Sequence, residues 1–371
     1  MKLTIVSHTP HYYNSNKEIC GWGPTILEVN SLLRTFDTID HIAPLHKGKN
    51  PNSSICYISS KIRFIPLKET SGKGILSKVN SILKIPSNLW QIHSHIGDSD
   101  LIQYRGPTGI GLYFIPYLAV RSRPKRWFKY AGNWIENNSP ITFRIQRWMM
   151  NANLAKCYVT INGKWPNQKP HLLSFENPCL TNEEIISGGV FASQKKFEKD
   201  LIMCFVGSLA PFKGALRAVK ALINSRNTRI SKFIIIGDGT DKIEIEKLSI
   251  NANIEIEVRG FLDRIAIAEV YKSAHLIILP SESEGFPKVI AEASAYGCIP
   301  IVSDVSSIGQ YINSNNGFLM KDSSIETIRN NLNILERSSN LSLLSKNVQS
   351  IAKLFTFEYY NERIRKEILN N

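Results

Sequence analysis

Short apolar runs alternate with amphipathic segments through the second half of the chain. The apolar runs are rich in Ile, Val and Leu and lie at 201–207, 232–236, 254–261, 275–280 and 299–304. Between them, segments such as 215–225 place apolar residues at i, i+3, i+4 and i+7, the spacing of one helical face. This alternation predicts βα units and a parallel sheet covered on both faces. We therefore expect a Rossmann-like α/β domain over residues 198–354.

The first half shows the same alternation more weakly. Strand-like runs lie at 2–8, 39–45, 100–106 and 155–162, and a helical pattern lies at 24–36. Residues 50–96 follow neither period. We expect a second Rossmann-like domain over 1–185, a polar, glycine-containing connection over 181–198, and an amphipathic helix over 355–371.

Composition places the chain among folded globular proteins. It has 371 residues, 43% hydrophobic and 20% charged, which favours two domains. The six cysteines form no C-x-x-C pair, so reduced and mostly buried thiols in a cytosolic compartment are expected. The apolar run near the N-terminus is too short for a signal peptide. The apolar run at 109–120 is too short to span a membrane and contains Pro116.

The net charge of +14 is concentrated in the first half of the chain. Residues 1–190 contain 22 Lys and Arg against 11 Asp and Glu, whereas residues 191–371 contain 23 against 20. The segments 121–130 (RSRPKRWFKY) and 144–150 (RIQRWMM) combine cations with aromatic residues. Such segments are typical of membrane-surface or nucleic-acid patches, and equally of a solvated basic face.

The stretch 281–297 (SESEGFPKVIAEASAYG) holds the clearest candidate chemistry. A helix is predicted to begin at about Pro287 and to end before Gly297. Its first amides and Lys288 would attract a phosphate group. Glu284 and Glu292 can both reach a ligand there, because helical side chains lean toward the N-terminus. Alternatively, Glu284 only caps the helix and Glu292 pairs with a distant cation.

This stretch resembles the Glu-x7-Glu signature of family-4 retaining glycosyltransferases. The segment FVGSLAPFKG, at 205–214, is similar to the phosphate loop of that family, and further motifs follow in family order across residues 200–320. The resemblance implies an α/β GT-B fold: two Rossmann-like domains that face each other across a cleft, with a C-terminal helix that crosses back to the first domain.

The resemblance also implies the site residues. Glu284 and Lys213 would be catalytic, with Glu284 on hydroxyls of the transferred sugar and Lys213 on the diphosphate. The donor-binding residues would be Gly21, Gly23, Ser208, Gly260, Phe261, Leu262, Gly285, Phe286, Pro287, Lys288 and Glu292. The donor would be a nucleotide-diphosphate sugar as co-substrate, and neither another cofactor nor a metal site is expected.

The chain departs from the family pattern at two positions. Ser208 stands where the family often has a phosphate-binding arginine, so Arg105, Lys288 or Arg264 is a candidate replacement. Gly132 stands where many members have a histidine. The histidines that end the first predicted strand region, His8 and His11, are candidates for contact with the acceptor or a phosphate.

Two other motifs are interpreted as structural. Asp98-Ser99-Asp100 has the form of a D-x-D metal motif but precedes an apolar run, so it is expected to be a turn. Gly237-Asp238-Gly239 follows a strand but lacks the third glycine of a dinucleotide fingerprint, so NAD binding is not expected.

The sequence therefore predicts a retaining glycosyltransferase of bacterial surface polysaccharide synthesis. Its acceptor would be a glycan or polyprenyl-linked glycan, and it would act in the cytoplasm on an anionic membrane surface bound through the basic first domain, without nucleic acid as a partner. Three alternatives remain: a sugar-nucleotide 2-epimerase of the same fold, a non-catalytic nucleotide-sugar-binding protein, and a nucleic-acid-binding protein.

Overall fold

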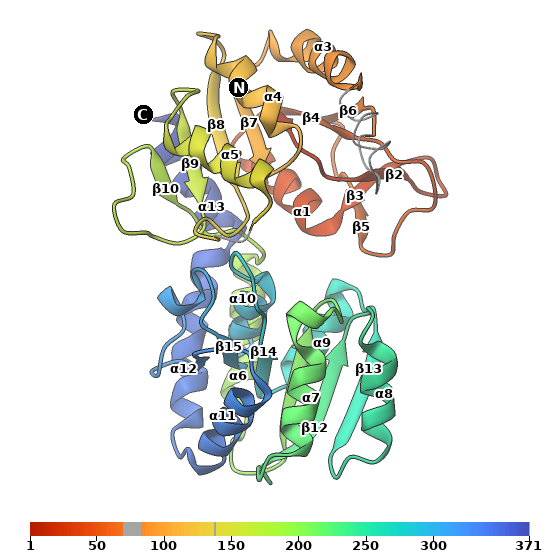
Figure 1. Cartoon of the computed structure of the whole chain (residues 1–371), viewed down its shortest axis with the longest axis vertical. Coiled ribbons are helices and arrows are strands. Elements are labelled where there is room, and N and C mark those ends of the chain that lie inside the picture. The colour runs from red at the N-terminus through yellow and green to blue at the C-terminus, as the bar shows by residue number, and fades with distance from the viewer. Residues whose placement is uncertain (70–82, 137–138, 371) are drawn as a thin grey trace. The chain divides into compact units, whose positions relative to one another are not determined.

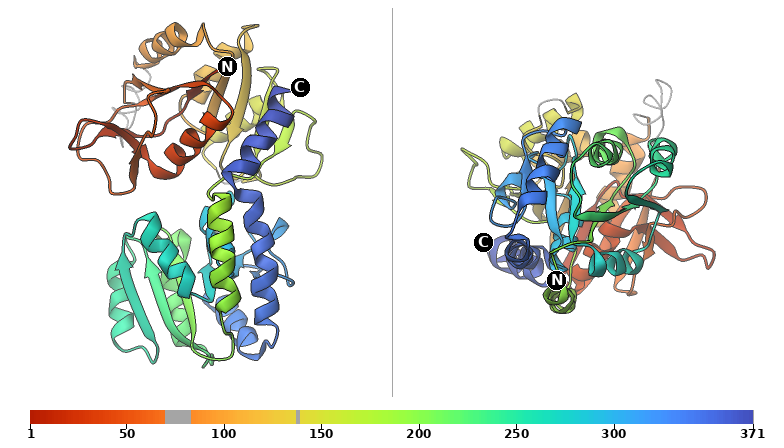
Figure 2. Two further views of the ribbon diagram at one scale, coloured as in Figure 1. Left: turned by 180° about the vertical axis from the view of Figure 1, so that it is seen from behind. Right: turned by 90° about the horizontal axis from the view of Figure 1, so that it is seen from below.

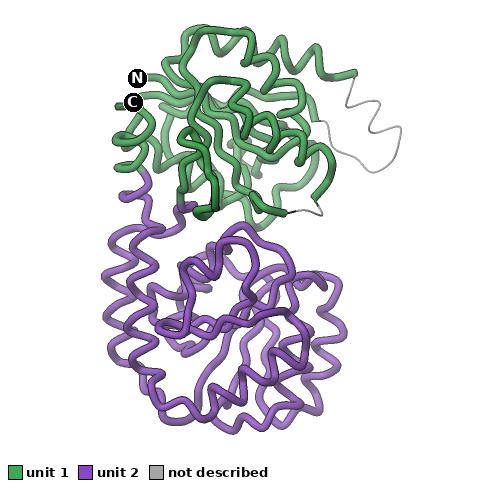
Figure 3. The backbone as a smooth tube through the Cα atoms, turned by 60° about the vertical axis from the view of Figure 1, so that its left-hand side comes forward, with its two compact units in different colours: residues 1–175, 361–371 green, residues 176–360 purple. Residues whose placement is uncertain are grey.

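The computed structural model describes residues 1–69, 83–136 and 139–370, and the chain forms two compact units. Unit 1 comprises residues 1–175 and 361–371, and unit 2 comprises residues 176–360 (Figure 3). The boundaries expected from the sequence, 185 and 355, differ from these by several residues.

Unit 1 is built on a parallel sheet with the strand order β10-β9-β8-β7-β1-β4-β6 (Figure 1). Its strands are β1 (Lys2–Val6), β4 (Thr38–Pro44), β6 (Ile62–Leu67), β7 (Leu101–Gly106), β8 (Lys125–Tyr130), β9 (Tyr158–Ile161) and β10 (Leu172–Ser174). Its helices include α1 (Gly23–Ser31), α3 (Ile85–Ile96), α4 (Gly111–Ala119) and α5 (Ile141–Asn151). Strand order reverses between β1 and β7, as in a doubly wound fold.

The C-terminal segment crosses from unit 2 back to unit 1. Helix α13 (Phe357–Arg363) continues into a π-helical segment, Ile364–Leu369. The Asn361 side chain accepts a hydrogen bond from Thr35 at 2.7 Å. Arg363 donates to the Ser174 carbonyl at 2.7 Å and lies 3.9 Å from the centre of the Phe175 ring. The predicted return of the C-terminal helix to the first domain is confirmed.

A small antiparallel sheet, β2-β3-β5, corrects the expectation for the cysteines. It consists of β2 (His11–Tyr13), β3 (Ile19–Trp22) and β5 (Ser54–Cys56). Cys20 and Cys56 lie opposite each other in its register and form a disulfide. Sequence spacing could not reveal this pair, because 36 residues separate the two cysteines. The remaining cysteines are free thiols, and three of them are buried.

Unit 2 has the parallel strand order β13-β12-β11-β14-β15-β16, the order of the doubly wound mononucleotide-binding fold. Its strands are β11 (Leu201–Val206), β12 (Ile230–Ile236), β13 (Glu255–Gly260), β14 (Leu276–Leu279), β15 (Ile299–Ser303) and β16 (Phe318–Met320). Its helices are α6 (Asn182–Gln194), α7 (Ala215–Ile223), α8 (Lys242–Ile250), α9 (Arg264–Ser273), α10 (Lys288–Ala295), α11 (Ile325–Arg337) and α12 (Leu341–Ala352). The predicted domain of βα units is confirmed.

The segment expected to be a polar connection is helix α6, which lies beside α12 (Figure 2). Thr181 and Glu184 form a capping box, which stabilises the start of the helix. The Thr-x-x-Glu spacing of this motif is visible in the sequence. A Cβ on Gly188 would lie 2.6 Å from the Ala295 carbonyl oxygen. The glycine in this segment therefore permits close helix packing rather than flexibility.

Both motifs have packing roles in the fold. Asp98 and Asp100 contact the side-chain nitrogen and the amide of Lys2, each at 2.6 Å, before β1 and β7 run into the sheet. A Cβ on Gly237 or Gly239 would lie 1.8 or 2.5 Å from a carbonyl oxygen of the loop after β11. These two glycines therefore allow two loops of unit 2 to pack backbone against backbone.

The aromatic residues of the basic segment 121–130 are core, whereas Arg121, Arg123 and Lys125 are exposed. Trp127, Phe128 and Tyr130 lie in β8 and are no more than 2% exposed. They therefore pack the interior of unit 1, and the expectation of a basic aromatic surface is wrong for this segment. Within residues 1–69, 83–136 and 139–370, no helix combines the length and apolar character needed to cross a membrane.

A buried chain of hydrogen bonds links the end of β1 to the small sheet. The Tyr57 hydroxyl lies 2.7 Å from His11 Nε2 and 2.7 Å from His41 Nδ1. His41 Nε2 lies 2.8 Å from the Ser7 hydroxyl, and His11 Nδ1 lies 2.8 Å from the Thr9 carbonyl. Burial lowers the pKa of His11 to about 4 and also lowers that of His41. Both rings are thus neutral packing elements near neutral pH.

This burial predicts a loss of stability in acid. Above pH 6.5, His11 is neutral in the folded and unfolded chains and contributes no pH dependence. As the pH falls from 6.5 toward 4, the unfolded chain binds a proton that the folded chain excludes, which destabilises the fold by up to roughly 3 kcal/mol. Urea unfolding at several pH values should show that His11→Gln has a flatter profile than the wild type, whereas His93→Gln, at an exposed position, does not. Equal slopes for all three proteins would contradict the assignment.

Candidate functional site

The candidate site of unit 2 lies where its strand order reverses. Strand β11 pairs with β12 on one side and with β14 on the other, and the chain leaves β11 and β14 at the same edge of the sheet. In open parallel sheets this reversal opens a crevice at the carboxyl ends of the strands, where ligands bind. The two loops concerned are 207–214, after β11, and 280–287, after β14.

The two predicted catalytic residues meet across these loops. Lys213 ends a short 3-10 helix, Pro211–Lys213, and its ammonium group forms an ion pair with the Glu284 carboxylate. The side chains are 22% and 11% exposed, so the pair is shielded yet still reachable by solvent. The structure therefore brings together a cation suited to phosphate and a carboxylate suited to hydroxyl groups.

Backbone contacts hold the two loops together. The Glu282 amide donates to the Phe212 carbonyl at 2.8 Å. Gly214 has a φ of +81°, and a Cβ on it would lie 2.5 Å from the Pro280 carbonyl oxygen. Only glycine fits this left-handed turn and close approach, so Gly214 fixes where Lys213 sits.

Arg217 is a residue of this site that the sequence reading missed. It lies one helical turn after Lys213 in α7 and donates to the carbonyls of Pro211 at 2.7 Å and Pro280 at 2.9 Å. It also pairs with Glu282 at 2.9 Å. Arg217 thus binds both loops at once. Local spacing does not reveal this role, because Gly214 separates the 3-10 helix of Lys213 from α7 and the two carbonyls lie far apart in the chain.

The start of α10 lies in the second loop. Pro287 is its N-cap residue and Lys288 its first residue, and Gly297, with a φ of +68°, follows its end, as predicted. Ser307 donates to the Gly285 carbonyl at 3.1 Å. The Phe286 side chain is buried against Phe355, with ring centroids 4.5 Å apart. This packing fixes the direction of the first amides of α10, which carry partial positive charge.

Glu292 has a cation partner within the unit. Its carboxylate lies 3.3 Å from Arg264 and its side chain is 19% exposed. Arg264 also makes a bidentate contact with Glu184, at 2.7 and 3.0 Å. Burial raises the pKa of Glu292, and the charges of Arg264 and Lys288 oppose that rise. Arg264, one candidate replacement for a phosphate arginine, is thus engaged by two carboxylates, as the alternative interpretation of Glu292 anticipated.

The remaining donor candidates of unit 2 lie at the same edge of the sheet. Ser208 is exposed in the loop after β11. Gly260 ends β13 with a φ of +67°, and the Phe261 ring beyond it is 46% exposed. Leu262 is half-buried against the core. Their positions are compatible with a nucleotide base, and their roles remain predictions.

The candidates in unit 1 are explained mainly by internal packing. A Cβ on Gly21 would lie 2.8 Å from the His11 ring, and a Cβ on Gly23 would lie 2.7 Å from the Ser53 carbonyl oxygen. His8 is exposed beyond the end of β1. His11 is wholly buried with both ring nitrogens hydrogen-bonded, so the expectation that it contacts a ligand is wrong.

Arg105 belongs to a buried charge cluster. It is 9% exposed and donates to Gln103 and to Glu28, each at 2.7 Å. Lys129 from the neighbouring strand binds the same Glu28 carboxylate. Of the three candidate replacements for a phosphate arginine, only Lys288 therefore stands at the start of α10.

Comparison with known proteins assigns this unit to a class. Residues 190–352 match the family Glycosyl transferases group 1. The match covers most of unit 2, so the site at the β11/β14 reversal lies in the part of the chain that is similar to this family.

Particular relatives agree with this class. The UDP-Gal:alpha-D-GlcNAc-diphosphoundecaprenol alpha-1,3-galactosyltransferase of Escherichia coli is 29% identical over 155 residues, 40% of each chain. The chain spans less than half the length of the curated relatives it matches. Sucrose-phosphate synthase of Thermosynechococcus elongatus has a TM-score of 0.74 at 17% identity, over 99% of this chain and 98% of its own. HepE of Anabaena with UDP has a TM-score of 0.66 at 14% identity over the whole of both chains. The fold is therefore GT-B, as predicted.

The bridging contacts of Arg217 generate a prediction. Arg217→Ala is expected to lower the free energy of unfolding of the chain by roughly 1–2 kcal/mol, because the buried Pro280 carbonyl loses its donor. It should also reduce the thermal shift produced by UDP or GDP, since the two loops are no longer joined. Lys220→Ala is the matched control, because Lys220 also lies on α7 and its ion pair with Glu244 of α8 is exposed to solvent. Identical urea and thermal-shift results for the two variants would contradict the bridging role.

Proposed function

We propose that the protein transfers a sugar from a nucleotide-diphosphate donor to a hydroxyl group of a glycan or lipid-linked glycan. The observation that carries the proposal is the Lys213–Glu284 pair at the strand-order reversal of a group 1 glycosyltransferase domain. Support also comes from HepE of Anabaena, a fold neighbour whose structure was solved with UDP and glucose.

Each part of the site has a task in this reaction. The first amides of α10 and Lys288 receive the diphosphate, whose negative charge increases as its bond to the sugar breaks. Lys213, held beside Glu284, neutralises this charge. Glu284 then accepts hydrogen bonds from sugar hydroxyls, and Glu292 accepts from the ribose. Such groups act on the transition state because they are fixed before the reaction.

We infer that the configuration at the anomeric carbon is retained. In this reaction the bond from the anomeric carbon to the phosphate oxygen breaks, and the acceptor oxygen forms the new bond on the same face. The departing phosphate oxygen takes the proton of the acceptor hydroxyl. Glu284 orients the sugar and Lys213 stabilises the leaving group, so neither forms a covalent intermediate.

A polyprenyl-linked acceptor is the favoured class. The E. coli relative is named for an acceptor sugar on diphosphoundecaprenol. An acceptor of this kind lies in the membrane, which fits a chain of net charge +14 that approaches anionic lipid.

The ion pair gives the direct test of the reaction. Glu284→Gln and Lys213→Gln should each lower turnover by ~10²-fold or more, since each removes a group fixed on the transition state. Turnover is measured as nucleoside diphosphate released from a panel of UDP- and GDP-sugars, with and without a glycan acceptor. Glu282→Gln, in the same loop and 57% exposed, should retain near-normal rates. Normal rates in the first two variants would refute the site assignment.

Helix α5 offers a surface for the membrane. Ile141, Ile145 and Trp148 are 69%, 43% and 63% exposed, and their i, i+4, i+7 spacing places them on one face with the exposed Arg144. The opposite face is buried through Gln146 and Met150. Apolar side chains with a cation on one face suit a helix lying at a lipid surface.

Membrane binding through α5 is tested with vesicles. The double variant Ile145→Ser, Trp148→Ser should lower partitioning onto phosphatidylglycerol vesicles by roughly ten-fold or more, because two large apolar side chains are lost. Sedimentation at low and high salt measures this partitioning. Trp90→Ser is the matched control, since Trp90 is 68% exposed on α3. Binding that falls only in the control, or no binding at low salt, would contradict the proposal.

A further inference from the structure

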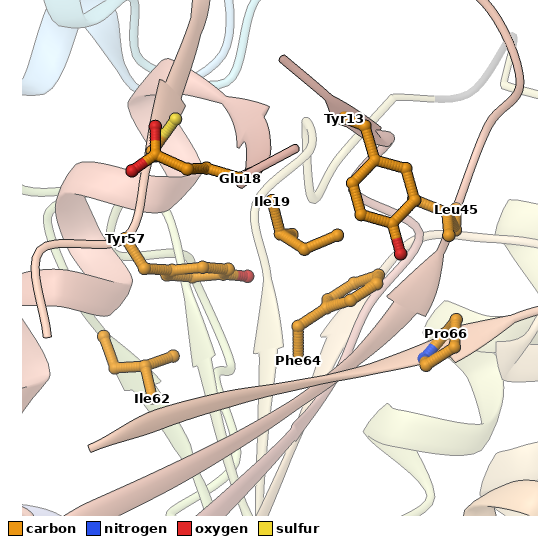
Figure 4. Close-up of a pocket in the computed structure, with 9 residues that line it drawn as sticks. Tyr13, Glu18, Ile19, Leu45, Tyr57, Ile62, Phe64 and Pro66 are labelled. Carbon is orange, nitrogen blue, oxygen red and sulfur yellow. The ribbon is translucent and has the colours of Figure 1, made fainter. Parts of the chain in front are cut away.

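Unit 1 contains a pocket of about 360 Å³ beside the outer strand β6 (Figure 4). The strand order of this unit's sheet reverses between β1 and β7, and β4 separates β6 from β1. The pocket therefore lies away from that reversal. No residue of the Lys213–Glu284 site lines it. Its size falls in the range of pockets that hold small molecules.

Two sheets form the walls of this pocket. Ile62, Phe64 and Pro66 of β6 line one wall, because alternate residues of a strand point to the same side. Tyr13 and Ile19 line the facing wall from β2 and β3, and Figure 4 shows the rings of Tyr13 and Phe64 turned into the space between.

The aromatic floor of the pocket is held in place from below. The Tyr57 hydroxyl is fixed between His11 and His41, each at 2.7 Å. The Phe64 ring packs on the His11 ring, with centroids 4.4 Å apart. The Cys20–Cys56 disulfide joins β3 to β5, and Cys56 itself lines the pocket. A ligand therefore meets ring faces that are already ordered, so little conformational entropy is lost on binding.

The charge of the lining selects among ligands. Glu18 is the one charged side chain among the described residues that line the pocket, and it is exposed. Its carboxylate accepts a hydrogen bond from Asn14 at 2.8 Å and has further lone pairs. An anionic ligand would be repelled by it. A hydrocarbon chain would desolvate the carboxylate without giving it a donor.

A neutral sugar ring satisfies both features of the lining. Its C–H faces pack on aromatic rings, and its hydroxyls donate to a carboxylate. We propose that this pocket binds a neutral sugar residue of the acceptor glycan, apart from the residue that carries the reacting hydroxyl. This inference rests on the proposed glycosyltransferase function. The pocket would hold a growing glycan on unit 1 while its end reacts elsewhere.

Saturation-transfer NMR on the full chain tests the pocket directly. The neutral probes are methyl α-galactoside, N-acetylglucosamine and maltose, and the contrasting probes are glucuronate and farnesyl phosphate. The variants are Tyr13→Ala, which removes a half-exposed ring, and Glu18→Gln. Trp22→Ala is the matched control, because Trp22 is a 50% exposed aromatic residue of β3 that does not line the pocket.

We expect at least one neutral probe to bind the wild type and Trp22→Ala equally, and to bind Tyr13→Ala about ten-fold more weakly. Neutral-sugar binding that is unchanged in Tyr13→Ala and Glu18→Gln would overturn the proposal, as would preferred binding of glucuronate or farnesyl phosphate that depends on Tyr13. Thermal shifts with UDP and GDP should be unchanged in Tyr13→Ala, which confirms that the variant is folded. If neither UDP nor GDP shifts the melting temperature of the wild type, the proposed function is refuted. The NMR experiment measures sugar binding to the pocket separately from this result.

Discussion

The site depends on close packing between two loops that leave neighbouring parallel strands. The loop after β11 and the loop after β14 touch through their backbones, and Arg217 donates to a carbonyl of each. Gly214 makes the contact possible, since a larger residue would collide with Pro280. The Lys213–Glu284 pair follows from this packing, because each loop contributes one of the two residues. Without the joined loops, a surface ion pair of this kind would be weak and mobile.

A second constraint is the burial of charge around α10. Glu292 lies in a helix of small apolar residues, where a lone carboxylate would be costly. Arg264 offsets that cost, and Glu184 in turn orients the guanidinium group with two hydrogen bonds. Glu184 also caps α6, so the position of the half-buried Arg264 is tied to the start of a helix that packs against α10. Arg264 is thereby a structural partner of the site.

The sequence was sufficient for the parts of the fold that repeat a local pattern. The βα units of unit 2 and the start and end of α10 could be predicted, since each depends on periodicity or on a motif with a known shape. Glu284 and Lys213 were expected to contact one donor, but their ion pair was not predicted. The disulfide, Arg217 and the Glu184–Arg264 contact could not, because they join residues far apart in the chain. Helix α6 was missed although its capping box was visible, since two glycines suggested a flexible connection.

Positive charge illustrates why composition predicts less than structure does. Part of the basic excess of unit 1 serves its own interior: Arg126 donates to backbone carbonyls of Leu118 and Ala155, and Arg105 and Lys129 share the carboxylate of Glu28. Trp127, beside Arg126, is core. A count of cations therefore overstates the surface potential that a membrane or phosphate would meet. What distinguishes a binding surface is a cation set among exposed apolar side chains, as Arg144 is on α5, or at a helix start, as Lys288 is on α10. Cations that pack inside the unit and cations of a binding surface differ in the side chains around them, and only the folded structure determines those surroundings.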